Sequence, residues 1–174
     1  MAIYEFEGKR PQIHPTTYID PEATIIGDVV IGENCYIGPG ARIRGDWGSI
    51  VIGAGSNVQD NCVIHANVGG KATLGPDSHI GHGAVLHSPT LEEHVTVGIN
   101  AVILDDSIIG SGSLVGAGSV VPPNTVIPPK SLVLGVPGKV VTEVSPKLAG
   151  ALAEGTGHYH ALPKRYHHSC KVMS

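Results

Sequence analysis

The sequence predicts an all-β solenoid, in which short strands coil into a column of stacked turns. Large aliphatic residues recur at every sixth position, and small residues stand four places after most of them. Aromatic residues make up only 4% of the 174 residues, whereas the chain contains 24 glycines and 13 prolines. A compact core usually recruits large aromatic side chains. This composition therefore favours many thin, similar layers over one thick core.

The six-residue period holds for twenty aliphatic anchors. They are Ile13, Ile19, Ile25, Ile31, Ile37, Ile43, Ile52, Val58, Ile64, Leu74, Ile80, Leu86, Leu91, Val97, Ile103, Ile109, Val115, Val121, Ile127 and Val133. We expect each anchor to point inward from a short strand, a small residue to fill each corner, and Gly or Asn to ease the turns. Because one coil cannot bury its own inner face, the coils must stack.

Cysteine usage agrees with this interpretation. Cys35 and Cys62 occupy the small position of the repeat, which predicts that they are core residues. The chain has three cysteines and no CxxC motif, which argues against a disulfide framework and against a cysteine zinc site.

The repeat register breaks in three places. Three extra residues lie around 44–49, four extra residues lie around 66–71, and one residue is missing around 88–90. Insertions in a solenoid are usually loops that gather on its functional face. We therefore expect loops at these three positions, which all flank histidine-rich segments.

The repeat also sets the domain boundaries. Residues 1–12 are expected to lead into the solenoid, which occupies 13–138. Ser145 and Pro146 supply an N-cap and a first helical residue. Residues 139–174 are therefore predicted to form a C-terminal α-helix and tail, packed along the solenoid or against a neighbouring subunit.

Charge and the N-terminal sequence limit the class of partner. The net charge is −4 and no basic run is present, so nucleic acid is a poor partner. Glu5 and Glu7 stand where a signal peptide would be basic, and no apolar stretch reaches membrane length. We expect a cytoplasmic protein with no membrane partner.

Three histidines form the candidate metal site. His65 and His87 each follow an anchor, Ile64 and Leu86, so they occupy the same position one coil apart, about 4.8 Å from each other. Zinc–nitrogen bonds of about 2.0–2.1 Å let two such imidazoles share one ion. His82 lies one face earlier and would struggle to reach that ion within its own chain, whereas the adjacent subunit of a trimer could supply it. On spacing alone, unliganded surface histidines fit the sequence equally well.

The other histidines fit this site less well. His79 precedes an anchor and matches no ligand geometry that the register allows. Five further histidines are expected to be solvated, namely His94, His158, His160, His167 and His168.

The six-residue pattern resembles the hexapeptide repeat of left-handed parallel β-helices, which are triangular prisms with three hexads per coil. Twenty hexads then give about seven coils and a prism roughly 30 Å long. The left-handed sense is implied by the resemblance, since the general crossover rule favours the opposite hand.

Several motifs together resemble the signature of γ-class carbonic anhydrases and their bacterial homologues, over residues 10–160. These motifs are Arg44-Gly45-Asp46, Asn57-Val58-Gln59-Asp60-Asn61, His65, and His82 followed five residues later by His87. The resemblance implies a homotrimer with Zn²⁺ between its subunits, or alternatively Fe²⁺ or Co²⁺. The ligands would be His65 and His87 of one chain and His82 of the next. The implied reaction is the reversible hydration of CO2 to bicarbonate by a metal-bound hydroxide.

The resemblance also implies roles for residues around the metal. Gln59 would hydrogen-bond the hydroxide and orient a lone pair toward CO2, with support from Asn57. Tyr159 resembles a tyrosine that lies near the metal in several relatives.

An arginine–carboxylate element would complete the site. Arg44 and Asp46 would pair across the subunit interface, and Asp60 would help to fix the arginine. Such a pair serves as a structural device as readily as a catalytic one.

Two departures from the family pattern bear on turnover. Trp47 stands where the best-studied relatives carry an acid, and Ala66–Lys71 contains no carboxylate. Because acids at these places assist proton export, a catalytically weak or inactive metal-binding homologue is one alternative. A hexapeptide-repeat acyltransferase or a CoA thioesterase-type protein is another, which a lack of stoichiometric metal would favour.

Overall fold

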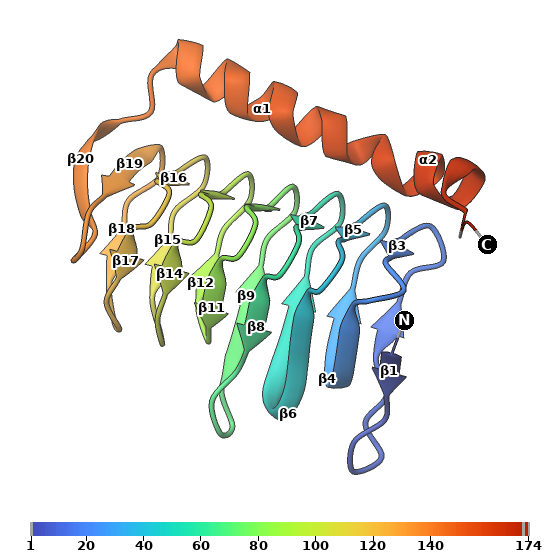
Figure 1. Cartoon of the computed structure of the whole chain (residues 1–174). Helices are drawn as coiled ribbons and strands as arrows, with labels where there is room; N and C mark the ends of the chain where they lie inside the picture. Colours follow the sequence, from blue (N-terminus) through green and yellow to red (C-terminus); the bar gives the residue numbers. More distant parts are fainter. Residues whose placement is uncertain (1, 172, 174) are drawn as a thin grey trace.

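The structure is a computed structural model that describes residues 2–171 and 173. Short parallel strands stack into a column, and a helix runs along one side of it (Figure 1). The all-β solenoid with a C-terminal helix that the sequence predicts is confirmed. The three faces of the column position the candidate site.

The face covered by the helix, called here the helix face, carries one parallel strand for each of seven turns, and β20 (Lys139–Glu143) adds an eighth, antiparallel strand at its end. The seven parallel strands follow in chain order. They are β3 (Tyr18–Ile19), β5 (Tyr36–Ile37), β7 (Asn57–Val58), β10 (His79–Ile80), β13 (Thr96–Val97), β16 (Leu114–Val115) and β19 (Ser131–Leu134).

The next face along the chain, called the histidine face, carries His65 and His87. It consists of β1 (Ala2–Tyr4), the first halves of β4 (Thr24–Ile31) and β6 (Arg42–Ile52), β8 (Val63–His65), β11 (Val85–His87), β14 (Val102–Ile103) and β17 (Val120–Val121).

The third face continues from the histidine face around a corner of the column. It consists of β2 (Gln12–Ile13), the second halves of β4 and β6, β9 (Lys71–Leu74), β12 (Thr90–Leu91), β15 (Ile108–Ile109) and β18 (Val126–Ile127).

The core is a stack of aliphatic anchors. Ile43, Ile64, Leu86 and Ile103 lie directly opposite one another on successive strands and are fully buried. The small corner residues are buried as well, including the two predicted core cysteines. Burial raises the pKa of both of these thiols to about 11, so they stay protonated and unreactive.

The turns use the residues that the repeat predicts. Asn34, Asn61, Asn100 and Asn124 all have φ between 52° and 59°, in the left-handed region. Asparagine tolerates this region better than other residues with a side chain. The prediction that Gly or Asn eases each turn is therefore confirmed for these corners.

The first register break is a strand and not the loop that the sequence predicts. Residues 44–49 lie inside β6, and the extra residues appear as a shift in its pairing with β4 after Gly27. A Cβ on Gly27 would lie 2.4 Å from the carbonyl oxygen of Gly45, and one on Gly45 would lie 2.5 Å from that of Asp28. Because neither residue has a Cβ, the backbones of β4 and β6 can lie this close where both strands bend around the corner of the column. The second break is a loop as predicted, and the third is a short turn.

The C-terminal region begins with a strand that the sequence analysis did not predict. β20 (Lys139–Glu143) pairs antiparallel with β19 at the end of the column. Helix α1 (Pro146–His160) follows, and the hydroxyl of Ser145 accepts a hydrogen bond from the backbone N–H of Leu148, as expected of an N-cap. A second helix, α2 (Leu162–Ser169), ends the described chain.

Both helices pack on the helix face. The ring of Tyr159 on α1 lies 5.7 Å from that of Tyr36, and the ring of Tyr166 on α2 lies 4.7 Å from that of Tyr18. Four of the five tyrosines of this chain thus lie where the helices meet the column.

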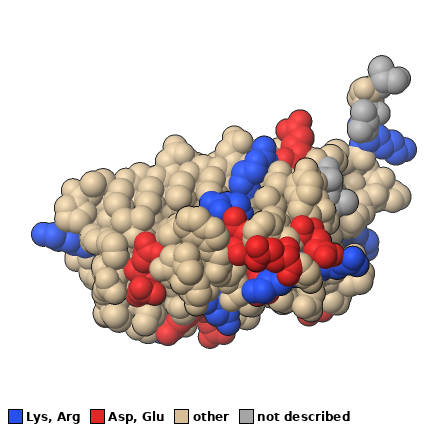
Figure 2. All heavy atoms as spheres, turned by 90° about the horizontal axis from the view of Figure 1, so that it is seen from below, with Lys and Arg blue, Asp and Glu red and all other residues tan. Residues whose placement is uncertain are grey.

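The surface carries charges of both signs. Figure 2 shows acidic and basic side chains lying beside one another on the face seen from below, without a continuous basic surface. Within the described residues, no helix combines the length and apolar character needed to cross a membrane.

Candidate metal centre

The histidine face brings together the two histidines that the repeat register pairs. His87 lies directly opposite His65 on the neighbouring strand, as predicted. Nδ1 of His65 and Nε2 of His87 are 3.1 Å apart. In a tetrahedral zinc site, two nitrogens at about 2.0–2.1 Å from the ion are about 3.3 Å apart. The two imidazoles therefore fit as neighbouring ligands of one ion.

Each of these imidazoles is held from behind by a carboxylate. Asp46 Oδ1 lies 3.0 Å from Nε2 of His65, and Asp105 Oδ1 lies 2.7 Å from Nδ1 of His87. The amide of Asn67 donates to the same oxygen of Asp105 at 3.1 Å. A carboxylate on the second ring nitrogen is the usual support of a metal-binding histidine, because it fixes both the tautomer and the ring orientation.

Arg44 and Asp46 pair within one chain, with Nη1 and Oδ2 2.7 Å apart. The expected pairing across a subunit interface stays a prediction. Burial alone would raise the pKa of Asp46, but hydrogen bonds from Arg44 and His65 outweigh it and lower that pKa. Burial, with the nearby Arg44 guanidinium, lowers the pKa of His65 against the opposing effect of Asp46. The neutral imidazole is the form that binds a metal.

Trp47 covers the outer side of this cluster. Its ring lies 5.4 Å from the ring of His65, and the Arg44 guanidinium lies 5.9 Å from the indole centroid. The residue is nevertheless 58% exposed. It therefore forms an apolar rim at the site and supplies no ionisable group.

The third predicted ligand belongs to a second cluster, at the corner between the helix face and the histidine face. Nδ1 of His82 lies 3.1 Å from Oδ2 of Asp60. Within one chain Asp60 thus pairs with this histidine, and its expected role in fixing an arginine at a subunit interface stays a prediction. Among the residues that the structure describes, no group of three or more His, Cys, Asp or Glu side chains is placed to hold a metal ion. One chain by itself thus places two of the candidate ligands together and the third apart from them.

Asn57 and Gln59 extend the second cluster along the helix face, and both are buried. Nε2 of Gln59 donates to Oδ1 of Asn57 at 2.9 Å and lies 2.8 Å from Nε2 of His79. The ring of Tyr159 stands perpendicular to that of His79 at 5.2 Å. Burial raises the pKa of Tyr159, so this phenol stays protonated.

Sequence reasoning missed two residues of these clusters. Asp105 gives no signal in the six-residue repeat, because the register places Leu104 and not Asp105 next to His87. His79 gives a usable signal, since it lies opposite Asn57 in the predicted register. It is unsuitable as a ligand to the histidine pair, but it contacts Gln59.

His79 makes the stability of the protein depend on pH. Burial, with a smaller contribution from His82, lowers the pKa of His79 to about 4. In the unfolded chain, His79 takes up a proton near pH 6.5, whereas in the folded protein it stays neutral down to about pH 4. Protonation therefore favours the unfolded chain between these values, so the free energy of unfolding is unaffected above pH 6.5 and falls as the pH drops toward 4. We expect the metal-free protein to lose up to about 3 kcal/mol from this group over that range. Urea unfolding at several pH values should show a smaller loss for His79→Gln, and an equal loss would contradict the prediction.

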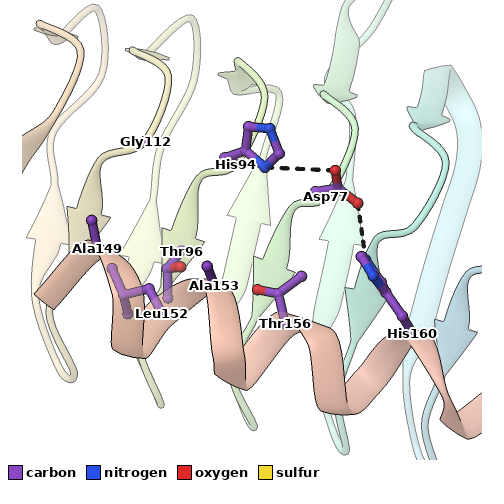
Figure 3. Close-up of a pocket in the computed structure, with 9 residues that line it drawn as sticks. All are labelled: Asp77, His94, Thr96, Gly112, Ala149, Leu152, Ala153, Thr156 and His160. Atoms are coloured by element: carbon purple, nitrogen blue, oxygen red, sulfur yellow. Dashed lines mark ion pairs between the residues drawn. The ribbon is translucent and has the colours of Figure 1, made fainter. Parts of the chain in front are cut away.

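A separate cavity of about 340 Å³ lies between α1 and the edge that joins the third face to the helix face (Figure 3). Asp77 lies between two imidazoles there, 3.5 Å from His94 and 2.9 Å from His160. His160 was expected to be solvated, but its Nε2 is buried. This edge is opposite the histidine face, and the cavity includes none of the predicted site residues.

Comparison with known proteins identifies relatives along most of the chain. The pattern of the family described as bacterial transferase hexapeptide (six repeats) matches residues 10–45 and 88–123. The chain is 39% identical to the carnitine operon protein CaiE of Escherichia coli strain K12 over 167 residues, which cover 96% of this chain and 85% of CaiE. CaiE of Proteus sp. strain LE138 is 45% identical over 145 residues, covering 83% and 74% of the two chains.

Two solved structures share the whole architecture. A candidate acetyltransferase from Bacillus cereus has a TM-score of 0.93 and 34% identity, covering 95% of this chain and 96% of its own. A hexapeptide transferase family protein from Anaplasma phagocytophilum has a TM-score of 0.91 and 32% identity, with coverage of 95% and 98%. The solenoid and its C-terminal helix are therefore common to all three proteins.

Proposed function

Because this chain belongs to the hexapeptide-repeat transferase family, as a relative of CaiE, we propose that it is a member that uses the fold as a metalloprotein. In this proposal it resembles the γ-class carbonic anhydrases and catalyses the reversible hydration of CO2. The metal is zinc, or alternatively Fe²⁺ or Co²⁺, bound between the subunits of a homotrimer by His65 and His87 of one chain and His82 of the next.

One observation carries the proposal. Each of the three candidate ligands has one ring nitrogen against an aspartate, at 3.0 Å for His65, 2.7 Å for His87 and 3.1 Å for His82. A carboxylate on one ring nitrogen is the usual support of a metal-binding imidazole, and at His65 and His87 it leaves the other nitrogens facing each other. The 3.1 Å separation of the facing nitrogens of His65 and His87 supports the same conclusion.

Assembly is required because one chain leaves the ligand set divided between two clusters. The histidine face offers a surface for it, since four outward valines stack in register beside the histidine pair. They are Val63, Val85, Val102 and Val120. Val63 is exposed and the other three are half-buried. A continuous apolar ladder of this kind is typical of a surface that packs against another chain.

The residues of the chain have distinct roles in the proposed reaction. A divalent metal held by the three histidines would supply hydroxide at neutral pH, because such ions lower the pKa of bound water to about 7. Asp46, Asp105 and Asp60 hold the three imidazoles in their ligating orientation, and Arg44 fixes Asp46 from its other oxygen. Gln59 orients the reacting water, and Trp47 limits solvent access from outside.

Proton export is the weaker part of this site. Trp47 carries no ionisable group, and Ala66–Lys71 contains no carboxylate that could accept a proton at the rim. We therefore propose slow turnover compared with relatives that carry acids at these places.

The proposal is tested by the metal content and mass of protein purified without oxygen, followed by stopped-flow CO2 hydration. We expect one metal per chain, the mass of a trimer, and hydration above that of His82→Ala. If the protein is a metal-bound trimer whose CO2 hydration does not exceed that of His82→Ala, the metal centre is supported but the proposed activity is contradicted. A preparation with no metal after reconstitution would overturn the metal centre.

Acyl transfer is the second candidate, because the family and both structural relatives are described as transferases. The connections between β2 and β19 are only two to five residues long, so no extended loop leaves the column to cover an acyl donor. Acetyl transfer or thioester hydrolysis by the metal-free protein, unchanged in His65→Ala, would favour this candidate.

Asp105 provides a direct test of the metal centre. Asp105→Asn keeps the shape of the side chain but removes the charge that supports His87, and we expect zinc affinity to fall about 10–100-fold. Asp106→Asn is the matched control, because Asp106 is exposed and its left-handed backbone suits asparagine. Competition with a chelator measures both affinities, and similar values for the two variants would contradict the assigned role of Asp105.

A further inference from the structure

His79 lies in the second cluster without being a candidate ligand, and both of its ring nitrogens face side-chain amides. Its Nε2 lies 2.8 Å from Nε2 of Gln59, and its Nδ1 lies 3.2 Å from Nδ2 of Asn57. The ring is held between these two side chains and Tyr159 of α1. Such a position is suited to fixing the direction of an amide and not to binding a metal.

The three side chains form a closed ring of contacts that a neutral imidazole cannot satisfy completely. Gln59 Nε2 donates to Asn57 Oδ1, so the other amide atom of Asn57, which faces His79, is its nitrogen. If both amide nitrogens donate to His79, the imidazole must accept at both of its nitrogens. A neutral imidazole accepts at one nitrogen and donates at the other. One of the two contacts must therefore be unmatched.

The geometry decides which contact is matched. The Gln59 contact is shorter, 2.8 Å against 3.2 Å, and falls at the optimum for a hydrogen bond. Nε2 of His79 is then the acceptor, and its ring proton lies on Nδ1. The doubly protonated ring would instead donate to Gln59 and reverse its amide, but burial keeps the ring neutral by lowering the pKa of His79 to about 4.

This arrangement leaves Gln59 with only one free polar atom. Its two amide hydrogens are donated to Asn57 and His79, so its Oε1 remains as an acceptor. Gln59 is only 3% exposed, but among the described residues its Oε1 is neither hydrogen-bonded nor fully buried. The oxygen is therefore reachable from outside the cluster.

We propose that His79 is a positioning residue, which as the Nδ1–H tautomer holds the Gln59 amide with its carbonyl oxygen presented to the reacting water. The tautomer follows from the contacts of one chain. Its consequence for catalysis rests on the proposed function, because only CO2 hydration requires an acceptor for the proton of that water.

The first test is nitrogen-15 NMR of the histidine side chains at pH 7, in which His79→Gln assigns the His79 signals. We expect the Nδ1–H tautomer in the natural protein, and a shift toward the Nε2–H tautomer in Gln59→Leu. An Nε2–H tautomer or a charged ring in the natural protein would overturn the proposal, as would an unchanged tautomer in Gln59→Leu. This readout does not depend on activity or on bound metal.

The second test separates a positioning role from a structural one. Where CO2 hydration is measurable, we expect His79→Leu to lower kcat about tenfold at unchanged KM and metal content. His79→Gln keeps an acceptor at this place and should recover most of the loss. Equal rates for His79→Leu and the natural protein would overturn the catalytic consequence, whereas a lack of hydration in every variant would count against the proposed function and leave the NMR result to decide the tautomer.

Discussion

Mixing two metal-free variants, His82→Ala and His87→Ala, is expected to restore metal binding. In the proposed trimer, each site takes His65 and His87 from one chain and His82 from its neighbour. A mixed interface can therefore join an intact histidine pair from the His82→Ala chain to an intact His82 from the His87→Ala chain. In each mixed trimer, about one site in three is complete.

The measurement uses co-expressed chains that carry different affinity tags, so that mixed trimers are isolated before metal analysis. The matched control mixes His65→Ala with His87→Ala. Both of these changes affect the same half of the site, so this mixture should bind no metal. The same absence of metal in the His82→Ala and His87→Ala mixture would contradict a site shared between chains.

Truncation of a core anchor is expected to have the largest effect on stability. Leu91 is fully buried on the third face, away from both clusters. Leu91→Ala removes its inward side chain and leaves a cavity in one layer of the stack, so we expect the free energy of unfolding to fall by about 2–5 kcal/mol.

Thr90→Ala is the control, since Thr90 is the exposed neighbour of Leu91 on the same strand. We expect it to change the free energy by no more than about 0.5 kcal/mol. Urea unfolding of both variants, followed by circular dichroism, measures the difference. If the two variants unfold at the same urea concentration, the anchors do not form the core that their burial indicates.

The six-residue repeat by itself determined the fold and the partnership of the two histidines. Each turn repeats the same short strands, so a position in the hexad fixes whether a side chain faces inward and which residue lies above it. The register therefore placed His65 opposite His87 across an insertion, and it placed Cys62 in the core. Both assignments depend on backbone register alone.

Other features required the tertiary structure, because they depend on how the chain turns between strands. Asp105 reaches His87 from outside the paired register, and residues 44–49 continue β6 because two glycine backbones pack closely. His79 gains its place from the closure of side-chain contacts with Asn57 and Gln59. Repeat spacing fixes backbone register, whereas the direction of a side chain at a corner follows only from the packed neighbours around it.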